Sequence, residues 1–492
     1  MQSKAGYAPV GRESVSSGSD LAAVAPAAAV AAPDDLAEAA WVGPRAPDAA
    51  AAELDRRRRA RRTLAAVLMA VAAVVALVVA LSGGAPQDDQ IVILISCDGF
   101  RSDYRHRAGP TLRRLMAEGV QAEFMRPAFP SKTFPNHYTL ATGLWPESHG
   151  IVGNSFVEPS TGEAFSMRSK QPYFWRGEPL WVTAEKAGVR TAPAMWPGSD
   201  VNMSIAGAPG DGLPTYGLGY TRSIDKMGRV AFLLEQLARP VETQPRFLTL
   251  YLEDMDDTGH MYGPDSPEVA LSILEVDKAL TALVDGLDTL RPETRERINL
   301  VVVGDHGMVD TSSDRVLLLP ELREDPELFS AATAAGFGLS PVLGLLPQRG
   351  REQAVLDKLS AAVDRATARE GSQSGLPRLT VARKTDLPER LHFAASDRIP
   401  PIIGIVAEGW TLQAGPDVQR PSLGSHGFDN ELHSMASSFI GWGPAFEATH
   451  GSVVAPFDGV EVYGIVTTIL GLPRLAPTNG TEAVRRRVLG PM

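Results

Sequence analysis

Three aspartates and three histidines occur in short polar clusters that are far apart in the sequence. The clusters are CDGFR with Asp98, DMDDTGH with Asp256 and His260, GDHG with Asp305 and His306, and SHGFDN with His426. Each has an ordinary explanation by itself, because an aspartate after a strand often caps a turn or helix and residues four apart on a helix often share a hydrogen bond. Together they supply carboxylate and imidazole ligands for two zinc ions, each held by about three protein groups with positions left open for substrate.

The hydroxyl of Thr133, in the stretch PSKTFPNH, is a candidate nucleophile. An alcohol is a weak nucleophile near neutral pH, but zinc lowers the pKa of bound water from about 15.7 to about 7 and should act similarly on an alcohol. Thr133 therefore needs a metal partner, and two zinc ions roughly 4 Å apart would hold the attacking and leaving oxygens of a displacement reaction in line. Such a site needs no general base, so we expect His137, His149 and His433 to make structural hydrogen bonds. On the residues alone, Ser131 is an alternative nucleophile.

Apolar runs lead into three of the polar clusters. They are IVILIS at 91–96, FLTLYL at 247–252 and INLVVVG at 298–304. Continuous runs of this kind are typical of strands buried on both faces, as in a parallel or mostly parallel sheet. Between them, proline-led segments at 110–118 and from Ser266 onward predict helices. This alternation predicts an α/β fold, with a mostly parallel sheet flanked by helices and a site along the carboxyl edge of the sheet.

The first part of the chain has a different composition. Residues 1–63 are rich in Ala, Pro, Ser and Gly, with six arginines between 56 and 62, and we expect them to be disordered. An uncharged run follows at 64–81, and its helical length of about 27 Å suits one transmembrane helix. A buried core helix and a cleaved signal peptide are the alternatives, but the run has no polar face and lies far from the N-terminus.

The arginines on the N-terminal side of this run predict its orientation. Basic residues next to a membrane span stay in the cytoplasm, so residues 1–63 should be cytoplasmic and everything after Ser82 exported. We expect a single-pass protein of a bacterial inner membrane, with its catalytic domain in the periplasm or outside the cell. That domain should cover 90–481, with a small α+β insertion at about 316–410 and a tail at 482–492.

Net charge and cysteine content limit the possible partners and metal sites. The net charge is −11, so we expect no surface that binds nucleic acid. Bound divalent cations would offset part of this charge and still permit a small phosphate-containing substrate. The single cysteine, Cys97, excludes an intrachain disulfide and a thiolate zinc cluster, so histidines and carboxylates must hold any metal. Cys97 itself is expected to be buried and inert.

Longer characteristic stretches surround the polar clusters. They read DGFR, FPSKTFPNHYTLATGLWPESHGIVGN, GEPLWVTAEKAG, MWPGSD, YLEDMDDTGHMYGP, GDHGM, RIPPI and SHGFDN. In this order, from about residue 91 to residue 481, they resemble the ectonucleotide pyrophosphatase/phosphodiesterase family, a branch of the alkaline phosphatase superfamily. The resemblance implies an alkaline-phosphatase-like fold and a hydrolase with two Zn²⁺ ions. Its expected reaction is cleavage of phosphodiester or pyrophosphate bonds of nucleotides or related diesters through a covalent threonine intermediate.

The resemblance also implies roles for particular residues. One zinc would be held by Asp98, Asp305, His306 and the Thr133 hydroxyl, and the other by Asp256, His260 and His426. Asn154 matches the asparagine that, with the backbone N–H of the threonine, stabilises a non-bridging phosphate oxygen. Phe134, Tyr220 and Tyr251 match positions that stack on or border a nucleobase, and Lys132 matches the pocket wall. The alternative for each of these four residues is that its side chain only packs within the fold and does not contact substrate.

Other reactions of the same superfamily remain open on the sequence. A phosphomonoesterase usually adds a cationic group for the extra phosphate charge, whereas the candidate positions here are asparagine and aromatic. A phosphonate hydrolase and a lipid-headgroup phosphodiesterase are further alternatives. The sequence contains neither the C-x-P-x-R setting of a sulfatase nor the HExxH motif of a metalloprotease. A non-catalytic, zinc-stabilised ectodomain is a distant alternative, opposed by the intact ligand and nucleophile set.

Overall fold

The computed structural model describes residues 89–203, 212–370, 378–415, 422–473 and 476–491. The predicted N-terminal segment 1–63 and the predicted transmembrane helix 64–81 lie outside these residues. Within the described ranges, no helix combines the length and the apolar character needed to cross a membrane. The chain divides into two units, Met1–Gly83 and Gly84–Met492, and all described residues belong to the second unit.

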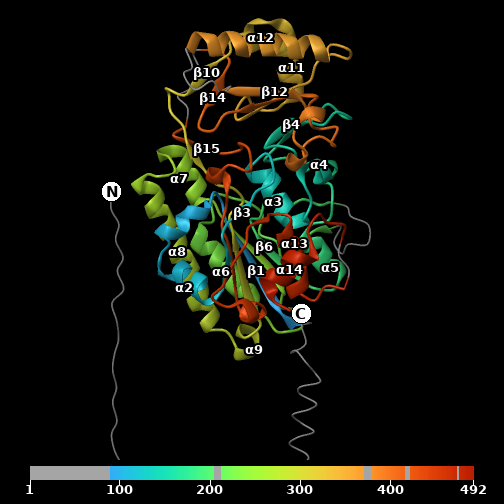
Figure 1. Cartoon of the computed structure of the whole chain (residues 1–492). Coiled ribbons are helices and arrows are strands. Elements are labelled where there is room, and N and C mark those ends of the chain that lie inside the picture. Colours follow the sequence, from blue (N-terminus) through green and yellow to red (C-terminus); the bar gives the residue numbers. More distant parts are fainter. Residues whose placement is uncertain (1–88, 204–211, 371–377, 416–421, 474–475, 492) are drawn as a thin grey trace, which may run out of the picture. The chain divides into compact units, whose positions relative to one another are not determined.

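A seven-stranded sheet forms the centre of this unit (Figure 1). In spatial order its strands are β17 (Val453–Val454), β2 (Val120–Ala122), β16 (Phe439–Trp442), β8 (Ile298–Val303), β1 (Ile91–Cys97), β7 (Phe247–Leu252) and β6 (Thr191–Ala194). The neighbouring pairs are parallel except where β16 meets β8 and β2, so within the described sheet only β16 runs against the others. The predicted α/β class with a mostly parallel sheet is confirmed.

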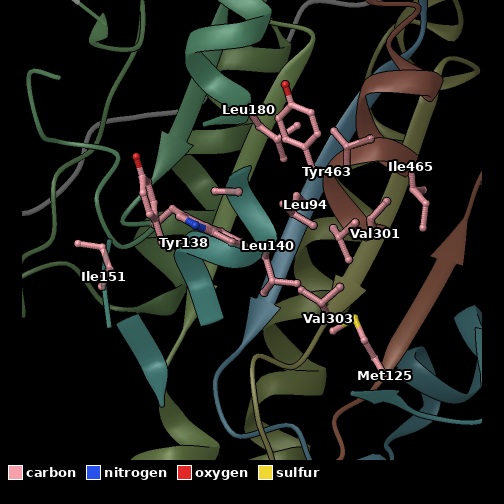
Figure 2. Close-up of a cluster of buried hydrophobic side chains, with 14 of the residues drawn as sticks. Leu94, Met125, Tyr138, Leu140, Ile151, Leu180, Val301, Val303, Tyr463 and Ile465 are labelled. Carbon is pink, nitrogen blue, oxygen red and sulfur yellow. The ribbon is translucent and has the colours of Figure 1, made fainter. Parts of the chain in front are cut away.

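Helices cover both faces of the sheet (Figure 1). One face carries α2 (Pro110–Glu118), α6 (Lys226–Leu237) and α8 (Pro267–Asp288), and the other carries α3 (Thr133–Thr142), α5 (Leu180–Lys186) and α13 (Glu461–Ile469). Because successive side chains of a strand point to opposite faces, Ile93 of β1 packs in the first core and Leu94 in the second. Figure 2 shows Leu94 in the second core, together with Val301 of β8, Leu140 of α3 and Ile465 of α13.

Helices α2 and α8 begin where the sequence predicts. Pro110 is the first residue of α2, and the side chain of Ser266 caps α8 by accepting an N–H of its first turn at 3.2 Å. Asp277, buried in the middle of α8, accepts the N–H groups of Leu112 at 2.7 Å and Thr111 at 3.2 Å. A carboxylate of one helix therefore caps the start of the other, which fixes α2 on α8 beside the sheet.

The stretch predicted as an insertion contains sheets and a core of its own. Its strands are β10 (Val316–Leu318) paired with β14 (Thr411–Gln413), and the antiparallel set β11 (Val342–Leu345), β13 (Ile402–Val406) and β12 (Leu379–Arg383). Its helices are α10 (Glu321–Glu324), α11 (Pro326–Ala335) and α12 (Glu352–Glu370). Leu328 of α11, Leu343 of β11 and Leu359 of α12 are buried together in this separate core.

Arg398, in the RIPPI stretch, connects the insertion to the main part of the unit. Its guanidinium is buried, donates from Nε to Glu158 Oε2 at 2.6 Å, and also donates to the carbonyl of Gly150 at 2.8 Å. Glu158 lies in the hairpin formed by β4 (Ser155–Val157) and β5 (Ala164–Ser166). Removing one partner of a buried ion pair lowers the free energy of unfolding by about 3–5 kcal/mol, because the other charge stays buried without a partner. The pair therefore holds the insertion against this hairpin.

Candidate active site

The polar clusters converge at the carboxyl edge of the parallel strands. Asp98 follows β1, Asp305 follows β8, and Asp256 lies on α7 (Asp254–Tyr262) shortly after β7. Because β8, β1 and β7 are parallel neighbours, their carboxyl ends meet at one edge of the sheet. Thr133 is the first residue of α3, and His426 follows β15 (Gly424–Ser425), a short strand paired with β9 (Val309–Asp310).

Asp98, Thr133, Asp305 and His306 form the first cluster. The Nε2 atom of His306 lies 3.0 Å from Asp305 Oδ2 and 3.4 Å from Asp98 Oδ1. The hydroxyl of Thr133 is 3.3 Å from the same nitrogen. Asp98, Asp305 and His306 are all at most 1% exposed. Two carboxylates and one hydroxyl therefore surround an imidazole nitrogen away from bulk water.

Asp256, His260 and His426 form the second cluster. The Nε2 atoms of His260 and His426 are 3.1 Å apart, and each lies 3.5 Å from a carboxylate oxygen of Asp256. The rings of His426 and His306 are stacked with their centroids 3.6 Å apart, which places the two clusters side by side. The His260 side chain is 36% exposed, so the second cluster opens to solvent while the first does not.

Backbone carbonyls orient the three imidazoles of the two clusters. Nδ1 of His260, His306 and His426 is bonded to the carbonyls of Gly424, Gly307 and Ser131, at distances of 2.8, 2.9 and 2.9 Å. A carbonyl oxygen only accepts, so each Nδ1 carries the hydrogen, and Nε2 is the nitrogen of each ring that is left to face the clusters. Histidine ligands of metal ions are oriented by such outer hydrogen bonds. The three Nε2 atoms are thus prepared to bind a cation.

Several acceptor atoms of the clusters have no donor. Asp98 Oδ1, Asp256 Oδ1 and Asp305 Oδ2 are buried and have no hydrogen-bond partner among the described residues. The Nε2 atoms of His260 and His426 face each other across 3.1 Å. Buried acceptors of this kind are unfavourable unless positive charge lies between them. The ligand atoms of Asp256, His260 and His426 all lie within 4.8 Å of one another. This donor set fits divalent cations of the zinc type.

Burial and neighbouring charges shift the protonation of these ligands. Burial, together with the Asp305 and Asp256 carboxylates, raises the pKa of Asp98 well above its usual value. Burial and the nearby His306 ring lower the pKa of His426 well below its usual value, so that ring stays neutral. For Asp305, burial alone would raise the pKa, but the His306 and His137 rings and their hydrogen bonds together outweigh burial, and the pKa falls well below the usual range. The crowding of carboxylates creates a negative potential that a bound cation would relieve.

Thr133, and not Ser131, presents its hydroxyl to the first cluster. The hydroxyl of Ser131 is buried and donates to the carbonyl of Phe428 at 2.8 Å. Asn154 accepts the backbone N–H of Phe134 through Oδ1 at 3.0 Å, so its amide N–H groups are available to another acceptor beside the nucleophile. The first N–H groups of a helix have no partner within the helix. At the start of α3 the N–H of Phe134 is bonded to Asn154 and Pro135 has none, so the N–H of Thr133 is the donor that remains.

The predicted aromatic slot comprises one partly buried and one exposed ring. Phe134 packs against Phe165 and Trp175, with ring centroids 6.1 Å away in both cases. Tyr220 is 48% exposed, and its centroid lies 6.4 Å from that of Tyr251. Both Phe134 and Tyr220 thus keep ring surface that a ligand can reach.

Tyr251 and Lys132 lie close to the clusters. Tyr251 is 8% exposed, and its hydroxyl donates to Asp98 Oδ2 at 2.6 Å. This contact with a candidate metal ligand has no signature in the sequence. Lys132 immediately precedes Thr133, and burial lowers the pKa of its amine to about 8 although Asp256 opposes the shift.

Other residues considered in the sequence have clear places. His149 is fully buried and shares a hydrogen bond with Thr139 at 3.0 Å, as a structural side chain does. Cys97 is buried, and its burial raises the pKa of the thiol, so the expectation of a buried, inert cysteine agrees with the structure. His137 lies closer to the clusters than expected, because its Nδ1 is 2.9 Å from the carbonyl of Thr133.

The backbone N–H of Gly99 is a group of the site that the sequence did not predict. The N–H of Gly99 donates to Asp305 Oδ1 at 3.0 Å. Gly99 has φ +69°, and a Cβ atom there would lie 3.2 Å from Asp256 Cα. The site therefore requires a glycine at position 99. The Asp98-Gly99 dipeptide in CDGFR is the one sequence signal that could have indicated the N–H donor at Gly99.

Known proteins resemble this chain over most of the described unit. A family model described as type I phosphodiesterase / nucleotide pyrophosphatase matches residues 92–429. An uncharacterized pyrophosphatase/phosphodiesterase of Schizosaccharomyces pombe is 37% identical over 401 residues, which cover 79% of this chain and 78% of the relative. Ectonucleotide pyrophosphatase/phosphodiesterase family member 1 of Mus musculus is 37% identical over 406 residues, which cover 81% of this chain but 42% of the relative.

Solved structures show the same relationship. Murine ectonucleotide pyrophosphatase/phosphodiesterase 5, as an inactive variant in complex with AMP, has a TM-score of 0.70 and 34% identity and covers 81% of this chain and 100% of that chain. The human protein of the same name has a TM-score of 0.71 and 32% identity, over 82% of this chain and 100% of that chain. The chain therefore belongs to the type I phosphodiesterase / nucleotide pyrophosphatase family and is a hydrolase of that class.

Proposed function

We propose that this protein is a two-zinc hydrolase that cleaves phosphodiester or pyrophosphate bonds of nucleotides or related diesters, with Thr133 as its covalent nucleophile. The observation that carries the proposal is the position of the Thr133 hydroxyl, which lies 3.3 Å from His306 Nε2 in a cluster where the buried Asp98 Oδ1 and Asp305 Oδ2 have no hydrogen-bond partner among the described residues. An alcohol becomes a useful nucleophile only when a base or a metal activates it. The family of the chain, and the AMP complex of a murine relative, support a nucleotide substrate.

The two clusters correspond to two metal sites in this proposal. Asp98, Asp305, His306 and the Thr133 hydroxyl hold one zinc ion, and Asp256, His260 and His426 hold the other. Bound zinc supplies the positive charge that lowers the pKa of the hydroxyl and stabilises the charge developing on the phosphate. Zinc is favoured over magnesium because half of the six carboxylate and imidazole ligands are nitrogen atoms, whereas magnesium prefers oxygen.

Thr133 and Asn154 carry out the steps that belong to the chain itself. The oxygen of Thr133 forms a bond to phosphorus while the bond from phosphorus to the leaving oxygen breaks, and the hydroxyl proton ends on the leaving group. The amide of Asn154 and the backbone N–H of Thr133 donate to a non-bridging oxygen as its charge grows. Water then displaces the Thr133 oxygen from phosphorus, which releases the phosphate product and restores the hydroxyl.

A substrate panel tests this function. The full-length protein would be assayed with a nucleotide 4-nitrophenyl diester, 4-nitrophenyl phosphate, a phosphonate ester and a phosphocholine diester, each with and without a chelator. We expect the nucleotide diester to have the highest kcat/KM, because Asn154 is a neutral donor and adds no charge for the dianion of a monoester. A higher kcat/KM for the monoester, the phosphonate or the phosphocholine diester would replace the proposed substrate class with that one.

The aromatic slot gives a separate prediction about specificity. Phe134→Ala and Tyr220→Ala should each lower kcat/KM for nucleotide diesters. The expected loss of transition-state stabilisation is about 1–3 kcal/mol, the usual range for stacking of a base on an aromatic ring. Bis(4-nitrophenyl) phosphate, a diester without a base, serves as the comparison substrate and should be hydrolysed nearly as well as by the wild type. Phe329→Ala is a matched control, because Phe329 is 52% exposed but lies in the insertion. Equal losses on both substrates would show that the two rings only support the fold.

A further inference from the structure

Tyr251 fixes the carboxylate of Asp98 by a hydrogen bond. The tyrosine hydroxyl donates to Asp98 Oδ2 at 2.6 Å, while Asp98 Oδ1 lies 3.4 Å from His306 Nε2 and has no donor among the described residues. One oxygen is therefore fixed by a short, charge-assisted hydrogen bond, and the other is directed into the cluster. Tyr251 is 8% exposed, which leaves little ring surface for a nucleobase.

His137 donates to the backbone of Thr133 and lies beside Asp305. Its Nδ1 lies 2.9 Å from the Thr133 carbonyl and 3.3 Å from Asp305 Oδ2. Because the carbonyl can only accept, Nδ1 carries the hydrogen, and the Ser96 hydroxyl can donate to Nε2 at 2.8 Å. His137 is fully buried. Both ring nitrogens are thus engaged, and the one N–H faces both the nucleophile residue and a candidate metal ligand.

Tyr251 and His137 also contact each other. Their rings meet edge to face, with centroids 5.1 Å apart and an interplanar angle of 82°. Tyr251 belongs to β7 and His137 to α3, one turn after Thr133. The ring of Trp196 also packs against the His137 ring in an edge-to-face arrangement, with the ring centroids 5.2 Å apart. The two rings are therefore fixed in a dry layer between the central sheet and the helix that carries the nucleophile.

We propose that Tyr251 and His137 act together as positioning residues for Asp98, Asp305 and Thr133, the three residues that carry the oxygen ligands of one metal site. This inference rests on the proposed function only in treating the first cluster as a zinc site. In this proposal Tyr251 orients a metal ligand, whereas the sequence predicted that Tyr251 would border the nucleobase. Outer hydrogen bonds of this kind typically change metal affinity or activity by about 10–100-fold when they are removed.

The test compares variants of the full-length protein in two measurements. Tyr251→Phe and His137→Leu remove the hydrogen bonds, and His137→Asn restores one, because the asparagine amide nitrogen can replace Nδ1. Zinc affinity is measured by competition with a chromogenic chelator, and kcat and KM are measured on a nucleotide diester and on bis(4-nitrophenyl) phosphate. Tyr138→Phe and His149→Leu are matched controls, since both side chains are buried but bond to Met203 and Thr139.

We expect Tyr251→Phe and His137→Leu each to weaken binding of one zinc by about 10–100-fold and to lower kcat on both substrates with little change in KM. His137→Asn should recover part of the loss, and the controls should bind zinc as the wild type does. An effect of Tyr251→Phe confined to KM for the nucleotide diester would overturn the proposal, as would unchanged zinc affinity or equal weakening in the controls. A wild-type protein that cleaves no nucleotide diester would refute the proposed function, while the zinc competition would still decide the inference about Tyr251 and His137.

Discussion

Replacement of Thr133 by alanine should lower kcat by about 10³-fold or more while the protein keeps its fold. The substitution removes the attacking oxygen and one oxygen ligand of the first cluster, so both the covalent step and the alignment of the substrate are lost. Asp98, Asp305 and His306 remain, and their positions depend on β1, β8 and the backbone of Gly99. We therefore expect bound zinc and an unchanged circular dichroism spectrum. The measurement is kcat on a nucleotide diester in metal-saturated protein.

Two further measurements separate covalent catalysis by Thr133 from direct attack by water. Thr133→Ser keeps a hydroxyl and should retain partial activity, whereas Ser131→Ala should have a small effect because that hydroxyl is bonded to the Phe428 carbonyl. Hydrolysis of a chiral thiophosphate diester should proceed with retention of configuration, since two in-line displacements restore the original hand. Inversion at phosphorus would remove Thr133 from the role of nucleophile.

Loss of metal should have an effect as large as loss of the nucleophile. Purified protein should contain close to two zinc ions per chain, and dialysis against a chelator should abolish activity that added zinc restores. His260→Ala should leave about one zinc, because it removes a ligand of the second cluster and does not touch the first. Elemental analysis of the wild type and the variant decides this point.

His392→Ala is a suitable control for that measurement. The His392 side chain is 41% exposed, close to the 36% of His260, but it stacks on Trp145 outside both clusters. It should keep both metal ions and full activity. An active wild-type preparation with a single tightly bound metal would contradict the two-site arrangement, whatever the behaviour of the variants.

Local signals in the sequence account for much of the fold. The start of α8 could be predicted because Ser266 and Pro267 form a capping pair. Strands β1, β7 and β8 could be predicted because short, uninterrupted apolar runs are typical of strands buried on both faces. The antiparallel strand β16 could not be predicted in this way. It has four residues, Phe439–Trp442, and its direction is decided by pairing with β8 and β2, which are distant in the sequence.

The candidate site also contains some groups that the sequence could predict and others that it could not. Carboxylates, imidazoles and the Thr133 hydroxyl are visible in the sequence because their side chains carry the chemistry. The carbonyls of Ser131 and Gly424, which orient His426 and His260, are invisible because every residue has a carbonyl. Only the fold brings these groups within reach of the histidine ligands.

The place of β16 has a consequence for how this protein can be made. This strand lies between β8 and β2, although it comes much later in the chain than either of them. Until the ribosome has passed Trp442, the facing edges of β8 and β2 have unpaired backbone groups, and open edges of this kind readily pair with other chains. The central sheet can therefore be completed only after Trp442 has been synthesised. Chains that stop before Phe439 should aggregate instead of forming a smaller working enzyme.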